Sequence, residues 1–229
     1  MKILALDTAT QACSTALLTA DAVITRELLT ERGHAEHILS MIDAVLAEAG
    51  IGLHEVSALA FGRGPGAFTG VRLAASVAQG LAFAAQLPVV PVSDLLAIAQ
   101  RALDEDRELE HVLVCQDARM QELYWACFDR GTDGQASLVG AENVGRAGEV
   151  ELPAAWRGAI GAAGQGFRVY PELKNTPKDG FASTREDLLP RAVEIARLAW
   201  PCALAGLTVS AQEALPVYVR DDVTRTSRI

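Results

Sequence analysis

The sequence has 229 residues, half of them apolar, and a formal net charge of −9. Its length and apolar content predict one large or two small globular domains and exclude a disordered chain. The acidic balance argues against extensive contact with nucleic-acid phosphates, because such contact depends on Lys and Arg.

Four widely spaced cysteines form no C-x-x-C pair, so they indicate free buried thiols rather than a zinc or redox motif. Asp7 interrupts the apolar start, which is not typical of a secretory signal. No apolar run approaches the ~20 residues that span a bilayer. We therefore expect a cytoplasmic protein that does not contact a membrane.

The first thirty residues predict an antiparallel meander of three strands, over residues 2–6, 13–19 and 22–29. Asp7 and Thr8 form a polar turn at the end of the first strand. Residues 35–49 then predict an amphipathic helix that Gly50 ends. Its apolar stripe contains Ala35, Ile38, Leu39, Ile42, Val45, Leu46 and Ala49.

The opposite side of this helix is a mixed face that faces either solvent or a partner. It carries His37, Met41, Ala44 and Glu48. His34 and His37 share its first turn and raise the question of a metal site. However, H-x-x-H lacks a third ligand and is not the H-E-x-x-H motif, so we expect surface or contact histidines and no metal.

A glycine-rich loop follows a buried strand predicted over residues 58–61 and leads into a helix over residues 71–85. It is neither a Walker loop nor a dinucleotide-binding fingerprint, so it is either a tight turn or a generic anion site. We expect Thr69 to cap the helix and Phe68 to be buried. We also expect Gly66 and Gly70 to lie where a side chain would clash or where φ is positive. The residues of this loop are Gly64, Pro65, Gly66, Phe68, Thr69, Gly70 and Arg72.

The helix after the loop carries a stripe of small residues that includes Ala74, Ala78 and Ala82. Such a stripe packs closely, either within the chain or against another subunit. A strand over residues 87–92 and a helix capped by Ser93 or Asp94 follow. The charged segment 104–108 marks the predicted boundary between an N-terminal lobe, residues 1–105, and a C-terminal lobe, residues 106–229.

The second half opens as the first does, with strands over residues 111–116 and 122–128 joined by a turn at Asp117. Arg119 and Met120 occupy this turn, and their bulk argues against an intact phosphate site there. Residues 131–191 are rich in loops. A helix over residues 188–200, which Pro201 ends, and an extended segment over 216–220 follow.

The segment Gly-Pro-Gly-Ala-Phe-Thr-Gly-Val-Arg at residues 64–72 resembles the GPGSFTGLR signature of the TsaB (YeaZ) family. The similarity returns at residues 4–10, 117–124 and 216–220. It implies an α/β fold with two related lobes of the actin/Hsp70/sugar-kinase (ASKHA) superfold, each a mixed sheet flanked by helices, the second lobe being a degenerate copy. In that superfold, Asp7, Thr8 and Asp117 would mark a vestigial nucleotide site.

The resemblance also implies a function: a non-catalytic subunit of the bacterial tRNA threonylcarbamoyladenosine machinery. Such a subunit binds the transferase TsaD as a heterodimer, is joined by the ATPase TsaE, pairs with itself when alone and meets tRNA only indirectly. We expect no cofactor on this subunit alone, although ATP can act at the level of the complex. The predicted partner interface comprises His34, His37, Met41, Ala44, Ala74, Ala78 and Ala82.

Two other functions stay open at this point. One is a self-sufficient ATPase or kinase of the same superfold that uses Asp7 and Asp117. The other is a metallopeptidase built on His34 and His37.

Overall fold

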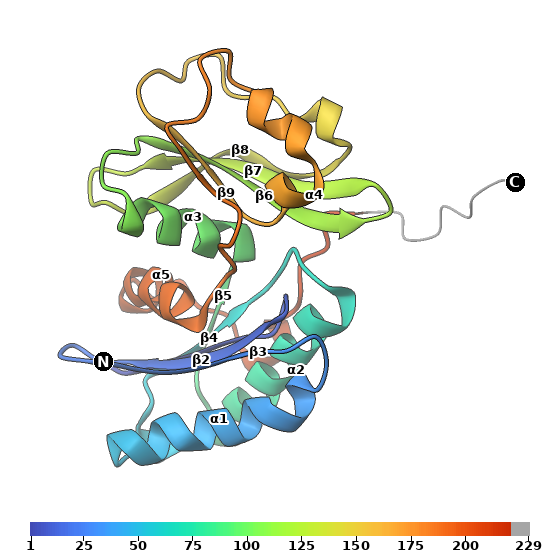
Figure 1. The fold of residues 1–229 in the computed structure, drawn as a ribbon. Coiled ribbons are helices and arrows are strands. Elements are labelled where there is room, and N and C mark those ends of the chain that lie inside the picture. Colours follow the sequence, from blue (N-terminus) through green and yellow to red (C-terminus); the bar gives the residue numbers. More distant parts are fainter. Residues whose placement is uncertain (221–229) are drawn as a thin grey trace, which may run out of the picture.

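The computed structural model describes residues 1–220, which form two lobes stacked on one another (Figure 1). Each lobe is built on a mixed sheet of five strands, in the orders β3-β2-β1-β4-β5 and β10-β9-β6-β7-β8. The first sheet contains β1 (Ile3–Asp7), β2 (Ala12–Leu18), β3 (Val23–Leu29), β4 (Ala58–Gly62) and β5 (Val89–Val92). The second contains β6 (His111–Arg119), β7 (Glu122–Arg130), β8 (Ala136–Gly145), β9 (Ile160–Ala163) and β10 (Ser183–Arg185).

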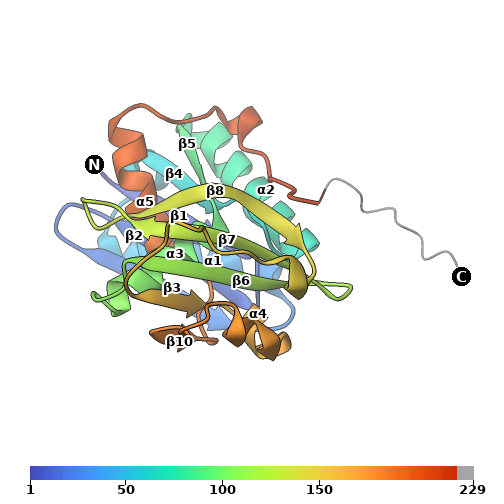
Figure 2. The same ribbon diagram turned by 90° about the horizontal axis from the view of Figure 1, so that it is seen from above.

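The helices form layers on these sheets. They are α1 (His34–Ala49), α2 (Phe68–Ala85), α3 (Asp94–Glu105), α4 (Gly166–Val169) and α5 (Ala192–Leu204). Short 3₁₀ turns occupy Leu53–Glu55, Ala147–Glu149, Pro171–Asn175 and Ala211–Glu213. Helices α1 and α2 cover the outer face of the first sheet, while α5 and α3 lie between the sheets (Figure 1). Viewed from above, the second sheet lies across the first lobe (Figure 2).

Both lobes repeat one plan. In the first, β1 pairs antiparallel with β2 and parallel with β4, with Leu4 opposite Leu17 and Leu59. In the second, β6 pairs antiparallel with β7 and parallel with β9. The strand orders correspond one to one, which confirms the predicted meander and the two related α/β lobes.

The predicted boundary at residue 105 separates the strands of the two sheets but not their helices. Helix α3, although it precedes the boundary, packs on β6, β7, β8 and β9 of the second sheet. Helix α5, although it follows the boundary, returns to pack on β1, β2, β4 and β5 of the first sheet. The division at 105/106 is therefore wrong for both helices, because each covers the sheet across the boundary from it.

The central strand β1 is buried along its whole length, since α1 and α2 cover one face of its sheet and α5 covers the other. Helix α1 buries Ile38, Ile42, Val45 and Leu46, and Gly50 ends it with a φ of 67°. Leu39, predicted for the core, is instead half exposed, because the buried stripe of α1 is narrower than the apolar pattern.

The structure changes two predicted helix ends. Helix α2 begins at Phe68 after an uncapped Ala67, so Thr69 lies inside the first turn and is not the cap. Helix α5 runs to Leu204 and contains Pro201, which was expected to end it. By contrast, the hydroxyl of Ser93 caps α3 as predicted, accepting a hydrogen bond from the Leu96 N–H at 3.2 Å.

Candidate functional site

The predicted alanine stripe of α2 faces the core of its own lobe. Ala74, Ala78 and Ala82 are buried against the first sheet in one cluster with Leu59 and Phe61. Their small side chains let α2 approach the sheet closely. These three alanines are therefore not part of an exposed interface, and that part of the prediction is wrong.

The opposite face of α2 is exposed and carries little charge. Arg72, Ser76, Gly80 and Phe83 follow one another along it at helical spacing, and Phe83 is 71% exposed. A side chain built at Gly80 would meet nothing within 4 Å. By length and composition alone, α2 is apolar enough to cross a membrane, with a mean hydropathy of 1.2. Here it covers the first sheet and leaves an apolar face outside.

Helix α1 lies beside α2 and has a mixed face of its own, the side that carries Glu48, whose carboxylate pairs with Arg26 of β3. His37 is exposed, while Met41 and Ala44 are half-buried at the surface. We call the exposed face of α2, together with this partly exposed face of α1, the α1/α2 surface; its members are His37, Met41, Ala44, Arg72, Ser76, Gly80 and Phe83.

His34 has a structural contact. Its Nε2 lies 2.9 Å from the carbonyl oxygen of Thr10, which ties the start of α1 to the turn after β1. Among residues 1–220, no group of three or more His, Cys, Asp or Glu side chains is placed to hold a metal ion. Neither His34 nor His37 therefore belongs to a described metal-ligand cluster.

The glycine loop packs directly on the turn after β1. The Ala67 N–H donates to the Ala9 carbonyl at 2.7 Å, and the Thr8 hydroxyl donates to the Gly70 carbonyl at 2.7 Å. A Cβ at Gly66 would lie 2.6 Å from the Ala9 oxygen, and one at Gly70 would collide with the Thr8 carbonyl. The prediction that both positions exclude a side chain is confirmed.

Phe68 does not anchor this loop in the core. It is half exposed at the start of α2, and the guanidinium carbon of Arg72 lies 3.5 Å from its ring centroid. The ring centroid of Tyr218 lies 6.1 Å from that of Phe68. The prediction of a buried Phe68 is wrong, because backbone contacts to Ala9 and Thr8 anchor the loop instead.

Two buried carboxyl groups meet beneath the loop. Asp7 and Asp94 are 0% and 1% exposed, and both lie against Gly62. Asp7 Oδ1 accepts from the Ala9 N–H at 3.0 Å, and Asp94 Oδ2 accepts from the Gly64 N–H at 2.5 Å. The other oxygens, Asp7 Oδ2 and Asp94 Oδ1, find no donor among residues 1–220. A proton on one carboxyl is therefore needed to join the pair.

The environment holds that proton. Burial raises the pKa of Asp7 to about 6. Burial and the neighbouring charge of Asp7 raise the pKa of Asp94 well above its ordinary value. The pair links the end of β1, the glycine loop and the start of α3.

A cleft of about 1380 Å³ opens between the lobes beside this loop. It is lined by the turn after β1, the glycine loop, the β6–β7 turn and residues 217–220. In the β6–β7 turn, Arg119, Met120 and Gln121 all have positive φ, and Met120 is 79% exposed. Arg119 and Met120 thus point outward and do not fill the turn as predicted.

The three residues predicted for a nucleotide site are all engaged within the chain. Asp7 is paired with Asp94, and Thr8 donates to Gly70. Asp117 accepts from the Arg119 N–H at 3.0 Å and pairs with its guanidinium at 3.4 Å. A buried Asp7 that shares a proton is a poor ligand for a metal-bound phosphate.

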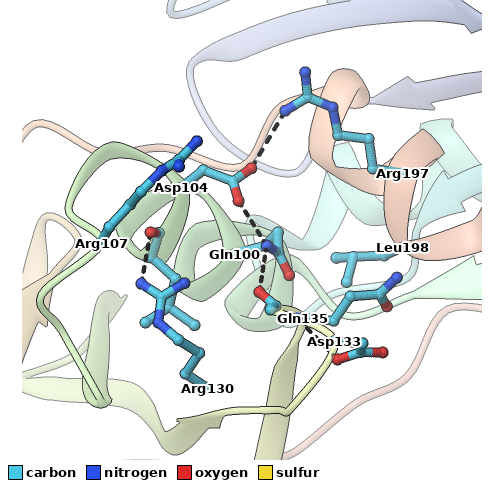
Figure 3. A pocket seen from close by; sticks show the side chains of 10 residues that line it. Gln100, Asp104, Arg107, Arg130, Asp133, Gln135, Arg197 and Leu198 are labelled. Carbon is cyan, nitrogen blue, oxygen red and sulfur yellow. Dashed lines mark hydrogen bonds and ion pairs between the residues drawn. The ribbon is translucent and has the colours of Figure 1, made fainter.

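A second cavity, of about 700 Å³, lies between α3, α5 and the β7–β8 turn (Figure 3). Arg197 of α5 pairs with Asp104 of α3 at 3.2 Å and so joins the two lobes. Arg130 donates to the carbonyl oxygens of Leu103, Asp106 and Leu109 at 2.8–2.9 Å. The guanidinium groups of Arg130 and Arg197 are therefore both engaged within the chain at this cavity.

Comparisons of the sequence with known proteins point to one family. Residues 27–182 match the family model described as TsaD: tRNA N6-adenosine threonylcarbamoyltransferase. The chain is 40% identical to the tRNA threonylcarbamoyladenosine biosynthesis protein TsaB of Haemophilus influenzae, over 98% of this chain and 95% of that protein. It is 37% identical to the protein of the same name from Escherichia coli, over 97% and 96%.

The chain belongs to the TsaB (YeaZ) family. Among solved structures, YeaZ from Pseudomonas aeruginosa superposes with a TM-score of 0.87 at 42% identity, covering 95% of this chain and 99% of that one. The two-lobed ASKHA-like architecture is thus shared with a TsaB-family protein over nearly the whole described chain.

Sequence reasoning missed three features of this TsaB-family chain. The sequence predicts Asp94 only as a candidate helix cap, whereas its carboxyl pairs with Asp7. The sequence predicts Tyr218 only as part of an extended segment, whereas its hydroxyl accepts from Arg72 Nε at 2.6 Å. Phe83, the most exposed large side chain of α2, was not singled out. Of these three features, only Phe83 could be found from the local sequence, because a Phe that lies off the apolar stripe of an amphipathic helix can be recognised by its spacing.

Proposed function

We propose that this chain is an accessory subunit for tRNA threonylcarbamoyladenosine synthesis, which binds a TsaD-type transferase through the α1/α2 surface. The proposal rests on the exposed, nearly uncharged face of α2 that ends in Phe83. An apolar face of this kind on a helix pair fits another helix pair, and burying a Phe side chain contributes roughly 1.5–3 kcal/mol. Relatives named for this biosynthesis support the choice of partner.

In this proposal the subunit does no chemistry of its own. Its contribution is to hold the transferase in an active assembly that TsaE joins, in the cytoplasm. The net charge of −9 supports indirect contact with tRNA, through the partner. When no partner is present, the same surface can pair two copies, because a two-fold contact needs only self-complementarity.

The subunit alone binds no nucleotide in this proposal, and any ATP acts in the assembled complex. The support is the engagement of Asp7 with Asp94, which removes the carboxylate that an ATPase or kinase would use. The bond from His34 to Thr10 supports a structural rather than a peptidase role for that residue.

Two matched substitutions test the partner surface. Phe83→Asp places a charge on the α1/α2 surface, whereas Leu204→Asp does so on α5, at a side chain that is 68% exposed. Both variants should stay folded by circular dichroism. Phe83→Asp should abolish co-purification with the TsaD-type subunit and self-association in sedimentation, while Leu204→Asp should leave both intact. Normal binding by Phe83→Asp would refute the proposed surface.

A further inference from the structure

Arg72 is the one charged residue on α2, and it stands at the end of the exposed face that runs through Ser76 and Gly80 to Phe83. Its side chain is held by two aromatic rings. The guanidinium carbon lies 3.5 Å from the Phe68 centroid and 5.5 Å from the Tyr218 centroid. Its Nε donates to the Tyr218 hydroxyl at 2.6 Å. Arg72 therefore has a fixed orientation although it is exposed.

The aromatic support is itself fixed by the backbone. The Val217 N–H donates to the Arg63 carbonyl at 2.8 Å, which attaches the segment before Tyr218 to the glycine loop. Beyond Tyr218, Arg220 pairs with Glu122 at 2.5 Å. Tyr218 is thus held on both sides along the chain, so Arg72 has little freedom left to lose on binding.

The free edge of this guanidinium has no counter-charge within residues 1–220. Its Nε is used by Tyr218, and no described residue forms an ion pair or hydrogen bond with either Nη. A guanidinium that presents two parallel N–H groups fits a carboxylate or a phosphate in bidentate geometry. This orientation, together with an edge that no residue among 1–220 occupies, fits a receptor for an oxyanion.

We propose that Arg72, held by Phe68 and Tyr218, receives a carboxylate side chain of the TsaD-type partner and sets the register of that partner along α2. This inference rests on the proposed function and adds the recognition chemistry. A protein carboxylate is favoured over an RNA phosphate, because the face of α2 beyond Arg72 carries no second cation for a neighbouring phosphate. Of the other arginines that line the adjoining cleft, Arg119 and Arg220 are already paired with acidic side chains. The apolar surface beyond Arg72 instead suits a helix with one acidic residue at the matching end.

The test measures affinity for the TsaD-type subunit of the same organism, with full-length proteins, by titration calorimetry at about 50 mM and about 500 mM salt. The variants are Arg72→Glu and Arg72→Lys, with Phe83→Asp as the surface reference. Arg107→Glu is the matched control, since it makes the same change in net charge at an exposed position on the second cavity (Figure 3).

Arg72→Glu should weaken binding at least about tenfold at low salt, and the loss should shrink at high salt. The affinity of Arg72→Lys should lie between those of the wild type and Arg72→Glu, because an ammonium group keeps the charge but cannot form the bidentate pair. Arg107→Glu should bind as the wild type does. A single acid-to-Lys change on the partner should restore binding to Arg72→Glu and so identify the carboxylate.

If Arg72→Glu binds within about twofold of wild type while Phe83→Asp does not bind, the recognition inference is wrong and the proposed function stands. If Phe83→Asp also binds normally, both are wrong. If Arg72→Glu binds the partner normally but the complex loses affinity for tRNA, the residue serves a phosphate and the carboxylate inference is overturned. If Arg72→Glu fails to fold, Arg72→Gln carries the same comparison.

Discussion

The buried pair of Asp7 and Asp94 predicts that replacing Asp94 by Asn stabilises the protein at neutral pH. In the unfolded chain both carboxyls ionise near pH 4. In the folded chain the proton on Asp94 is held more tightly than that on Asp7, whose pKa is about 6. The folded wild type therefore binds more protons than the unfolded chain above pH 4, and its stability falls as pH rises.

The size of this effect on the unfolding free energy follows from the pH range over which the folded chain holds the extra proton. Above pH 4 the unfolded chain has lost the proton that Asp94 keeps in the folded chain. For each further pH unit, this difference lowers the unfolding free energy by about 1.4 kcal/mol. Above pH 4 the cost therefore grows for as long as Asp94 keeps its proton. An Asn at position 94 avoids it, because its oxygen can still accept from the Gly64 N–H and its amide can donate to Asp7.

Denaturant unfolding from pH 4.5 to pH 8 measures the difference. Asp94→Asn should gain on the wild type as pH rises, by up to about 1.4 kcal/mol per pH unit. The exposed change Asp21→Asn, in the β2–β3 turn, should follow the wild-type curve. Parallel curves for Asp94→Asn and the wild type would show that the two carboxyls do not share a proton, and would refute the reasoning.

Three further predictions concern the loop, the core and the histidines. Gly70→Val should lower the unfolding free energy by roughly 1–3 kcal/mol through its clash with the Thr8 carbonyl. Gly80→Val, in open space, should lower it by less than about 1 kcal/mol. Urea titrations measure both values, and the reverse order would contradict the packing described for the loop. Ala78→Glu should unfold the chain in circular dichroism, because it buries an unpaired carboxylate at a cost of several kcal/mol, and a folded variant would contradict the burial of the stripe. Changing His34 and His37 together to Ala should leave the zinc content measured by mass spectrometry unchanged, and a stoichiometric loss of zinc would restore the peptidase hypothesis.

The sequence by itself determined the local structure and the family. Apolar runs bounded by turns placed the meander, and the helical spacing of apolar residues placed α1 and α3. Gly50 and Ser93 fixed helix ends through backbone chemistry that acts within a few residues. The glycines at positions 66 and 70 predicted a close backbone contact, but they did not predict that the contact is with the turn after β1. The signature at residues 64–72 pointed to the TsaB family and through it to the two-lobed fold.

The tertiary structure alone decided which side of α2 is buried. Both sides of that helix are small or apolar, so hydrophobic periodicity could not separate the core face of Ala78 from the exposed face of Phe83. Packing on the first sheet made the choice, and it also turned Phe68 outward, because the loop is anchored by its backbone.

The remaining features join residues that are distant in the sequence. Asp94 meets Asp7 across 87 positions (94 − 7), and Arg72 meets Tyr218 across 146. Helix α5 returns to a sheet whose strands were complete a hundred residues earlier. Local sequence patterns carry no information on such pairs, because each pair forms only when the two lobes pack against each other. That packing depends on the complete hydrophobic core and not on any one segment.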